Sequence, residues 1–72
     1  MEEISISTEF IKLDAFLKFC GEAGTGGEAK LLVAGGKIRV NGGVCEMRGK
    51  KLYPGDKVSA PGGEYLVRGE EK

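Results

Sequence analysis

The sequence predicts one small α+β domain, in which a strand and two helices precede three or four short strands. The chain has 72 residues, of which 40% are hydrophobic. A chain of this length buries only about 60% of its unfolded surface, which is enough for one modest core and no deep cleft. Apolar residues follow a helical period in the first half and alternate in the second half. Thirteen glycines, well above the ~7% average, imply many turns between short elements.

An amphipathic helix is predicted after a short strand or extended arm. The strand is expected at residues 4–7, where apolar and polar residues alternate. From residue 11 onward the apolar residues follow a helical period. The buried face of this helix consists of Leu13, Phe16, Leu17 and Cys20. Gly21 and Gly24 then supply the positive φ angles that are typical past the end of a helix.

A second short helix is predicted directly after the first. Thr25 and Glu28 have the spacing of a capping box, in which Thr25 is the N-cap. The apolar stripe of this helix consists of Ala29, Leu32 and Val33. Two glycines at 35–36 end the helix, so we expect two helices joined by a tight turn.

The second half of the chain predicts short strands joined by glycine-containing turns. Residues 37–40 alternate strictly, which sends Ile38 and Val40 inward and the two cations Lys37 and Arg39 to the other face. A hairpin turn is expected at 41–43, and a returning strand at 44–47. The remaining elements are turns at 54–56 and 61–63, strands from residue 58 and over 64–68, and a charged tail over 69–72.

The residue inventory argues against an enzyme and against a metal site. The sequence has no His, and its only cysteines are Cys20 and Cys45. A Cys–His nucleophile pair and a four-ligand zinc site are therefore excluded. We expect no cofactor and no small-molecule substrate. Both thiols should be reduced, because cytoplasmic proteins rarely form disulfides.

The hydropathy of the chain predicts a soluble cytoplasmic protein. Its apolar runs are far shorter than the ~20 residues that a membrane-spanning helix needs. No apolar stretch follows the N-terminus, so a secretory signal is not expected. We therefore expect no membrane partner.

The zero net charge conceals a strong asymmetry along the chain. All the charged residues of the segment 1–11 are acidic. The segment 30–51 contains a single acid, Glu46, and six bases, which are Lys30, Lys37, Arg39, Arg48, Lys50 and Lys51. Bases clustered on one face are typical of a nucleic-acid-binding protein, although a merely solvated face gives the same pattern. Lys12, at or near the start of the first helix, favours a binding role, because the helix dipole disfavours a cation there by ~0.3–1 kcal/mol.

The Thr25-Gly26-Gly27 segment has two interpretations. Thr25 can act purely as a cap, which contributes ~1 kcal/mol. The glycines can also let a phosphate approach the amides at the start of the helix. The spacing of a nucleotide-binding P-loop is absent, so ATP or GTP chemistry is not predicted.

Five segments of the sequence together resemble a known family. They are Lys12-Leu13-Asp14-x-Phe16-Leu17-Lys18, Thr25-x-x-Glu28-Ala29-Lys30-x-Leu32, Gly36-x-Ile38-x-Val40-Asn41-Gly42, Arg48-Gly49-Lys50-Lys51-Leu52 and Pro54-Gly55-Asp56-x-Val58. In this order they resemble the S-four (S4) domain, an RNA-binding module named for a ribosomal protein of the small subunit. The resemblance spans about residues 4–68 and is to the stand-alone bacterial YaaA-like members.

The resemblance implies an alpha-L fold, in which two short helices pack on a small, bent antiparallel sheet and RNA lies across the helices and adjoining strands. It implies RNA contacts at Lys12, Thr25, Gly26, Gly27, Lys30, Lys37, Arg39, Asn41, Arg48, Lys50 and Lys51. Many members of the family carry Arg at the position of Gly26, and Arg is common at that of Lys12. Both departures imply weaker affinity, or a site read mainly through backbone amides.

These observations predict a non-enzymatic, monomeric RNA-binding protein. Its expected target is structured RNA, by family analogy ribosomal RNA or a ribosome-assembly intermediate, recognised by shape and phosphate. The alternative is a protein-interaction adaptor that kept the fold with little RNA affinity, which the neutral net charge favours.

Overall fold

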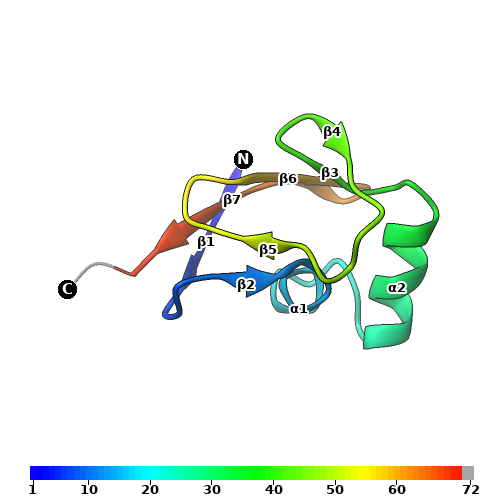
Figure 1. Ribbon diagram of the computed structural model, residues 1–72, viewed down its shortest axis with the longest axis horizontal. Coiled ribbons are helices and arrows are strands. Elements are labelled where there is room, and N and C mark those ends of the chain that lie inside the picture. The colour runs from blue at the N-terminus through cyan, green and yellow to red at the C-terminus, as the bar shows by residue number, and fades with distance from the viewer. Residues whose placement is uncertain (71–72) are drawn as a thin grey trace.

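A mixed five-stranded sheet and a separate two-stranded sheet frame two short helices. The computed structural model describes residues 1–70. In chain order its elements are β1 (Glu2–Ile6), β2 (Ile11–Lys12), α1 (Leu13–Phe19), α2 (Gly26–Ala34), β3 (Arg39–Val40), β4 (Gly43–Val44), β5 (Lys51–Leu52), β6 (Lys57–Ala60) and β7 (Gly63–Gly69). Figure 1 shows β1 and the end of β7 toward one end of the molecule, and α2 with the β3–β4 hairpin toward the other. The predicted α+β architecture, with two helices against a small sheet, is confirmed.

The five-stranded sheet has the order β1-β7-β6-β3-β4. All its pairings are antiparallel except one, because β1 pairs in parallel with β7. The expectation of a purely antiparallel sheet is therefore wrong at this edge. A parallel pair needs a long crossover, and here everything between the first and last strands supplies it.

The predicted hairpin turn is confirmed, but its second strand is shorter than expected. Asn41 and Gly42 both have positive φ, 53° and 88°, as a type I′ turn requires. The returning strand predicted at 44–47 is reduced to Gly43–Val44. The chain leaves the ladder at Cys45, whose side chain is buried and whose amide donates to the carbonyl of Ile38 (N···O 3.0 Å).

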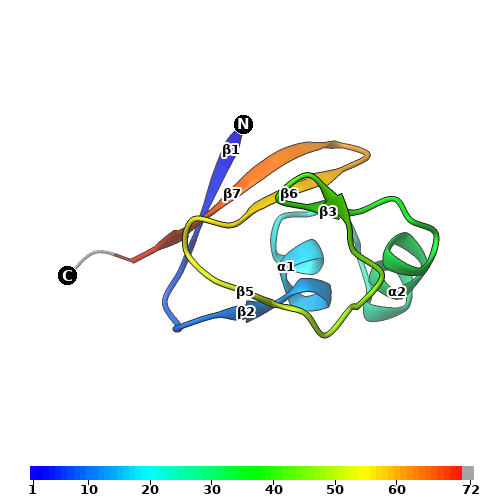
Figure 2. The same cartoon turned by 45° about the horizontal axis from the view of Figure 1, so that its top comes forward.

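A two-stranded ribbon, β2–β5, is the element that the sequence pattern did not predict. Ile11 pairs with Leu52, and Lys12 pairs with Lys51. Leu52 is fully buried, and Ile11 packs against the core from its edge. Figure 2 shows the two strands side by side, with β2 leading directly into α1.

The core forms where both helices meet the inward faces of the strands. The predicted stripe of α1 is buried at Leu13, Phe16 and Leu17, whereas Cys20, at the C-cap, is only half-buried. The Phe16 ring meets the edge of Tyr65 on β7, with ring centroids 6.2 Å apart. A fully buried Leu or Phe side chain contributes about 1.5–3 kcal/mol to stability. Within the described part of the chain, neither helix is long and apolar enough to cross a membrane.

The first two residues of the expected charged tail, Gly69 and Glu70, belong to the sheet or bond to it. Gly69 is the last residue of β7, and the Glu70 amide donates to the carbonyl of Ile6 (N···O 3.0 Å). The last two residues of the predicted tail, 71–72, lie outside the described residues.

Candidate nucleic-acid interface

The start of α1 brings together four of the predicted cations. Lys12 lies directly opposite Lys51 in the β2–β5 ribbon. The amides of Leu13 and Asp14 donate to carbonyls of the loop that leads into β5, which belong to Lys50 (2.9 Å) and Arg48 (3.0 Å). In Figures 1 and 2 the connection from β4 to β5 passes beside the point at which β2 becomes α1. We call Lys12, Arg48, Lys50 and Lys51 the basic cluster.

Backbone hydrogen bonds hold the basic cluster together. The first amides of a helix have no partner within the helix. At the start of α1 the loop carbonyls accept from two of them, and the Asp14 carboxylate accepts from the amide of Ala15 (2.8 Å). The loop is therefore fixed by its main chain, which leaves its side chains available for binding. An anion arriving here would meet cationic side chains rather than free amides.

Among residues 1–70, the side chains of the basic cluster form no ion pair. Lys12, Arg48 and Lys51 are exposed, and Lys50 is half-buried. Within residues 1–70 the one ion pair joins Arg68 to Glu3 (2.7 Å), which involves no residue of the basic cluster. Like charges that face each other across a strand pair destabilise it by roughly 0.2–1 kcal/mol. Lys12 also occupies the N-cap of α1, where the helix dipole opposes its charge.

The start of α2 presents open backbone amides. Thr25 is the N-cap, and its hydroxyl accepts from the amide of Glu28 (3.1 Å), so the predicted cap is present. Among the described residues the amides of Gly26 and Gly27 have no hydrogen-bond acceptor. A Cβ at Gly26 would meet no atom within 4 Å. Lys30 is exposed on the same helix, so an anion could reach both the amides and this cation.

Two other predicted cations, Arg39 and Lys37, are not part of the basic cluster. Arg39 is exposed on β3, between partners on β4 and β6. Lys37 borders a shallow depression of about 290 Å³ on the α2 side, together with the carboxylates of Glu22 and Glu28. The depression therefore gives Lys37 two acidic neighbours.

The side-chain amide of Asn41 forms hydrogen bonds through both its nitrogen and its oxygen. Its Nδ2 donates to the carboxylate of Asp56 (3.2 Å), and its Oδ1 accepts from the amide of Lys57 (2.9 Å). Its own amide donates to the carbonyl of Lys57 (2.8 Å). Asn41 thus ties the β3–β4 turn to the start of β6.

Two aromatic residues beside the basic cluster were missed by the sequence analysis. Phe10 and Tyr53 follow the same alternation as the ribbon, since each lies next to an inward residue, Ile11 or Leu52. Their rings lie 5.8 Å apart between centroids. The signal in the sequence was a pair of three-residue segments, 10–12 and 51–53, in each of which an inward apolar residue lies between two outward-facing residues.

Two comparisons with known proteins found a match. A family model described as "S4 domain" matches residues 4–68, which include the whole basic cluster. The "Probable ribosome maturation protein RlbA" of Bacillus subtilis (strain 168) is 42% identical over 65 residues, covering 89% of this chain and 92% of that protein.

Proposed function

Because the chain belongs to the S4 domain family, we propose that it is a non-enzymatic protein that binds structured RNA, specifically ribosomal RNA or a ribosome-assembly intermediate. The printed name of the Bacillus subtilis relative, a probable ribosome maturation protein, supports a ribosomal target. Such a target places the protein in the bacterial cytoplasm. We further propose that it binds as a monomer.

The facing pair Lys12 and Lys51 is the observation that carries this proposal. Two cations lie directly opposite each other, at a helix start that also disfavours positive charge. No carboxylate among residues 1–70 forms an ion pair with either one. An RNA phosphate between them would remove the repulsion and gain attraction from both.

The composition of the interface predicts how RNA is recognised. Proteins read A-form RNA through its shape, its phosphates and its 2′-hydroxyl groups, because the deep groove excludes side chains. The three lysines of the basic cluster are compact charges, and Arg48 alone can hold a phosphate in bidentate geometry. The amides of Gly26 and Gly27 would supply a second phosphate contact at the start of α2. The proposal therefore favours structured RNA over a particular sequence.

A pair of charge-reversal variants tests the location of the interface. Lys50→Glu with Lys51→Glu should weaken RNA binding by more than tenfold, while the melting temperature changes little, because Lys51 is exposed, Lys50 is only half-buried, and neither forms an ion pair among residues 1–70. Lys18→Glu with Lys57→Glu is the matched control, since both residues are exposed and outside the basic cluster. Equal losses from the two pairs would mean that only net charge matters.

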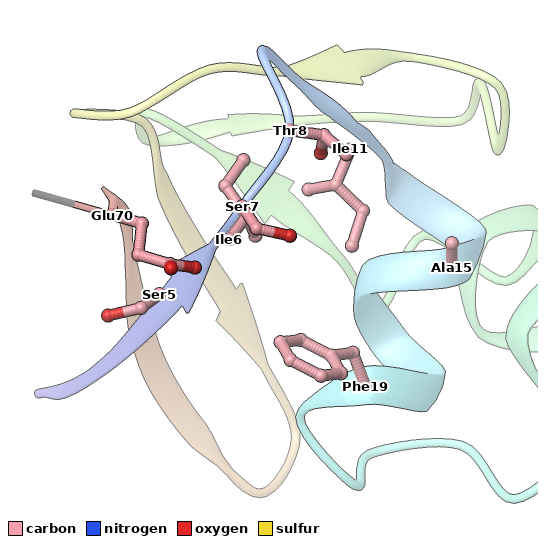
Figure 3. Close-up of a pocket in the computed structure, with 8 residues that line it drawn as sticks. All are labelled: Ser5, Ile6, Ser7, Thr8, Ile11, Ala15, Phe19 and Glu70. Carbon is pink, nitrogen blue, oxygen red and sulfur yellow. The ribbon is translucent and has the colours of Figure 1, made fainter. Parts of the chain in front are cut away.

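A second candidate function, protein binding, is favoured by an apolar pocket away from the basic cluster. The pocket has a volume of about 390 Å³ and lies between β1 and α1. Figure 3 shows the side chains of Ile11 and Phe19 pointing toward each other across it, with Glu70 at its rim. Phe19 is 62% exposed. The acids of residues 1–11 and Glu70 suit a basic protein segment that inserts an apolar side chain.

Crosslinking in cells distinguishes the two functions. A photoreactive residue at position 50 should capture ribosomal RNA fragments if the first proposal holds. A photoreactive residue at position 19 that captures one defined basic protein, without RNA at position 50, would favour the adaptor. Both positions are on the same folded protein, so each serves as the control for the other.

A further inference from the structure

The outer face of the β2–β5 ribbon carries an aromatic pair directly beside a pair of cations. We infer that this face stacks an unpaired nucleobase of the bound RNA, while the adjacent lysines hold its phosphate. The inference rests on the proposed RNA-binding function and adds the kind of RNA feature that is recognised. We call Phe10, Lys12, Lys51 and Tyr53 the ribbon face.

The strand register places these four side chains together. Lys12 is opposite Lys51, and the next pair outward along the ribbon is Phe10 and Tyr53. Side chains two residues apart lie on the same face of a strand, about 7 Å from each other. The residues between them, Ile11 and Leu52, point to the core. The ribbon face is therefore the side of β2–β5 that is turned away from the core.

Tyr53 is exposed and Phe10 is half-buried, unlike the buried aromatic pair of the core. Tyr53 is 43% exposed, whereas Tyr65 is 7% exposed and Phe16 is fully buried. The Phe10 and Tyr53 rings are tilted by 46°, so they do not cover each other's faces as parallel stacked rings would. Lys51 Nζ lies over the Phe10 ring, 4.8 Å from its centroid, so a cation already occupies one face of that ring, and Tyr53 is the more open of the two rings.

The chemistry of this face matches one nucleotide. Proteins that bind unpaired nucleic acid combine cations along the backbone with aromatic rings on which bases stack. On the ribbon face the cationic pair and the aromatic pair lie two residues apart along each strand. The lysines can therefore reach the phosphate, and the rings the base, of the same nucleotide. A duplex hides the faces of its bases, so only a loop, bulge or single-stranded end can use the aromatic pair.

The experiment compares two RNAs with the same stem, one closed by a single-stranded loop and one a blunt duplex. The double variant Phe10→Leu, Tyr53→Leu keeps apolar side chains and removes the aromatic faces. It should bind the looped RNA about tenfold more weakly and the duplex with unchanged affinity. Tyr53→Phe, which keeps the ring, should bind both RNAs as the unmodified protein does. A 2-aminopurine in the loop should be quenched by the unmodified protein and not by the double variant.

The outcomes separate this inference from the proposed function. If the unmodified protein binds both RNAs equally, or if the double variant loses affinity for both alike, the stacking inference is overturned and RNA binding stands. If the unmodified protein binds neither RNA, the proposed function itself is wrong. Melting curves of both variants identify a loss that comes from unfolding, and the quenching of 2-aminopurine by the unmodified protein, or its absence, then decides.

Discussion

Lys12 and Lys51 face each other across the β2–β5 ribbon, beside the start of α1. Lys12 is the N-cap of that helix, and Lys51 follows the loop whose carbonyls accept from its first amides. The fold thus holds two like charges together where both the strand pair and the helix dipole oppose them. Such an arrangement lowers the stability of the free protein and attracts an anion. Both properties are expected of a phosphate-binding site.

Lys12→Gln should weaken RNA binding and stabilise the protein at the same time. Removing one facing charge relieves repulsion of roughly 0.2–1 kcal/mol, so the free energy of unfolding should rise. If about four phosphates are engaged, the slope of log K against log salt should be about −3, and the variant should reduce its magnitude by about 0.7–0.9. Chemical denaturation and RNA titrations at several salt concentrations measure both. Lys18→Gln, at the favourable end of α1, should do the opposite by lowering stability without changing the slope.

Gly26→Arg should strengthen RNA binding. The space around Gly26 is open, so the larger side chain fits without displacing a neighbour. One added phosphate contact should improve affinity by about 1 kcal/mol, roughly fivefold, and steepen the salt slope by about 0.7–0.9. Leu31→Arg adds the same charge elsewhere on α2, at a residue that is 73% exposed. A gain of equal size from Leu31→Arg would show that the start of α2 is not a contact.

Asn41→Ala should destabilise the protein by about 1–3 kcal/mol. The variant loses the hydrogen bonds to Asp56 and Lys57 and places Ala at a φ of 53°, where a side chain without local hydrogen bonds is strained. Asn41→Gly relieves the strain and should recover part of the loss. Neither variant should change RNA affinity at temperatures where both are folded. Weaker RNA binding by both folded variants would show that Asn41 contacts the RNA.

Tyr65 should make stability depend on pH above pH 10. Its hydroxyl donates to the carboxylate of Glu22, which raises the pKa of Tyr65 from 10.0 to about 12. The folded state then binds the proton more tightly than the unfolded chain does. The resulting stabilisation is fully present below pH 10 and is lost as the pH rises to about 12. Denaturant titrations between pH 9 and 12 should show a steeper fall for the unmodified protein than for Tyr65→Phe, and parallel curves would contradict this assignment.

Much of the fold follows from local patterns in the sequence. The spacing of Leu13, Phe16 and Leu17 predicted the buried face of α1, and Thr25 predicted the start of α2. Asn41 and Gly42 predicted the hairpin turn. These signals could be recognised because helical period, capping and turn conformation depend on residues only a few positions apart.

Only the tertiary structure decided which distant segments meet. The parallel pairing of β1 with β7, and the pairing of β2 with β5, join parts of the chain that no local pattern connects. The second pairing gathers the basic cluster, places Phe10 beside Tyr53 and buries Leu52. By itself the sequence determined that cations and aromatic residues were present and that the cations concentrate in the segment 30–51. Their assembly into one surface depended on the burial of Ile11 and Leu52, because a register shift by one residue would turn every side chain of the ribbon to the opposite face.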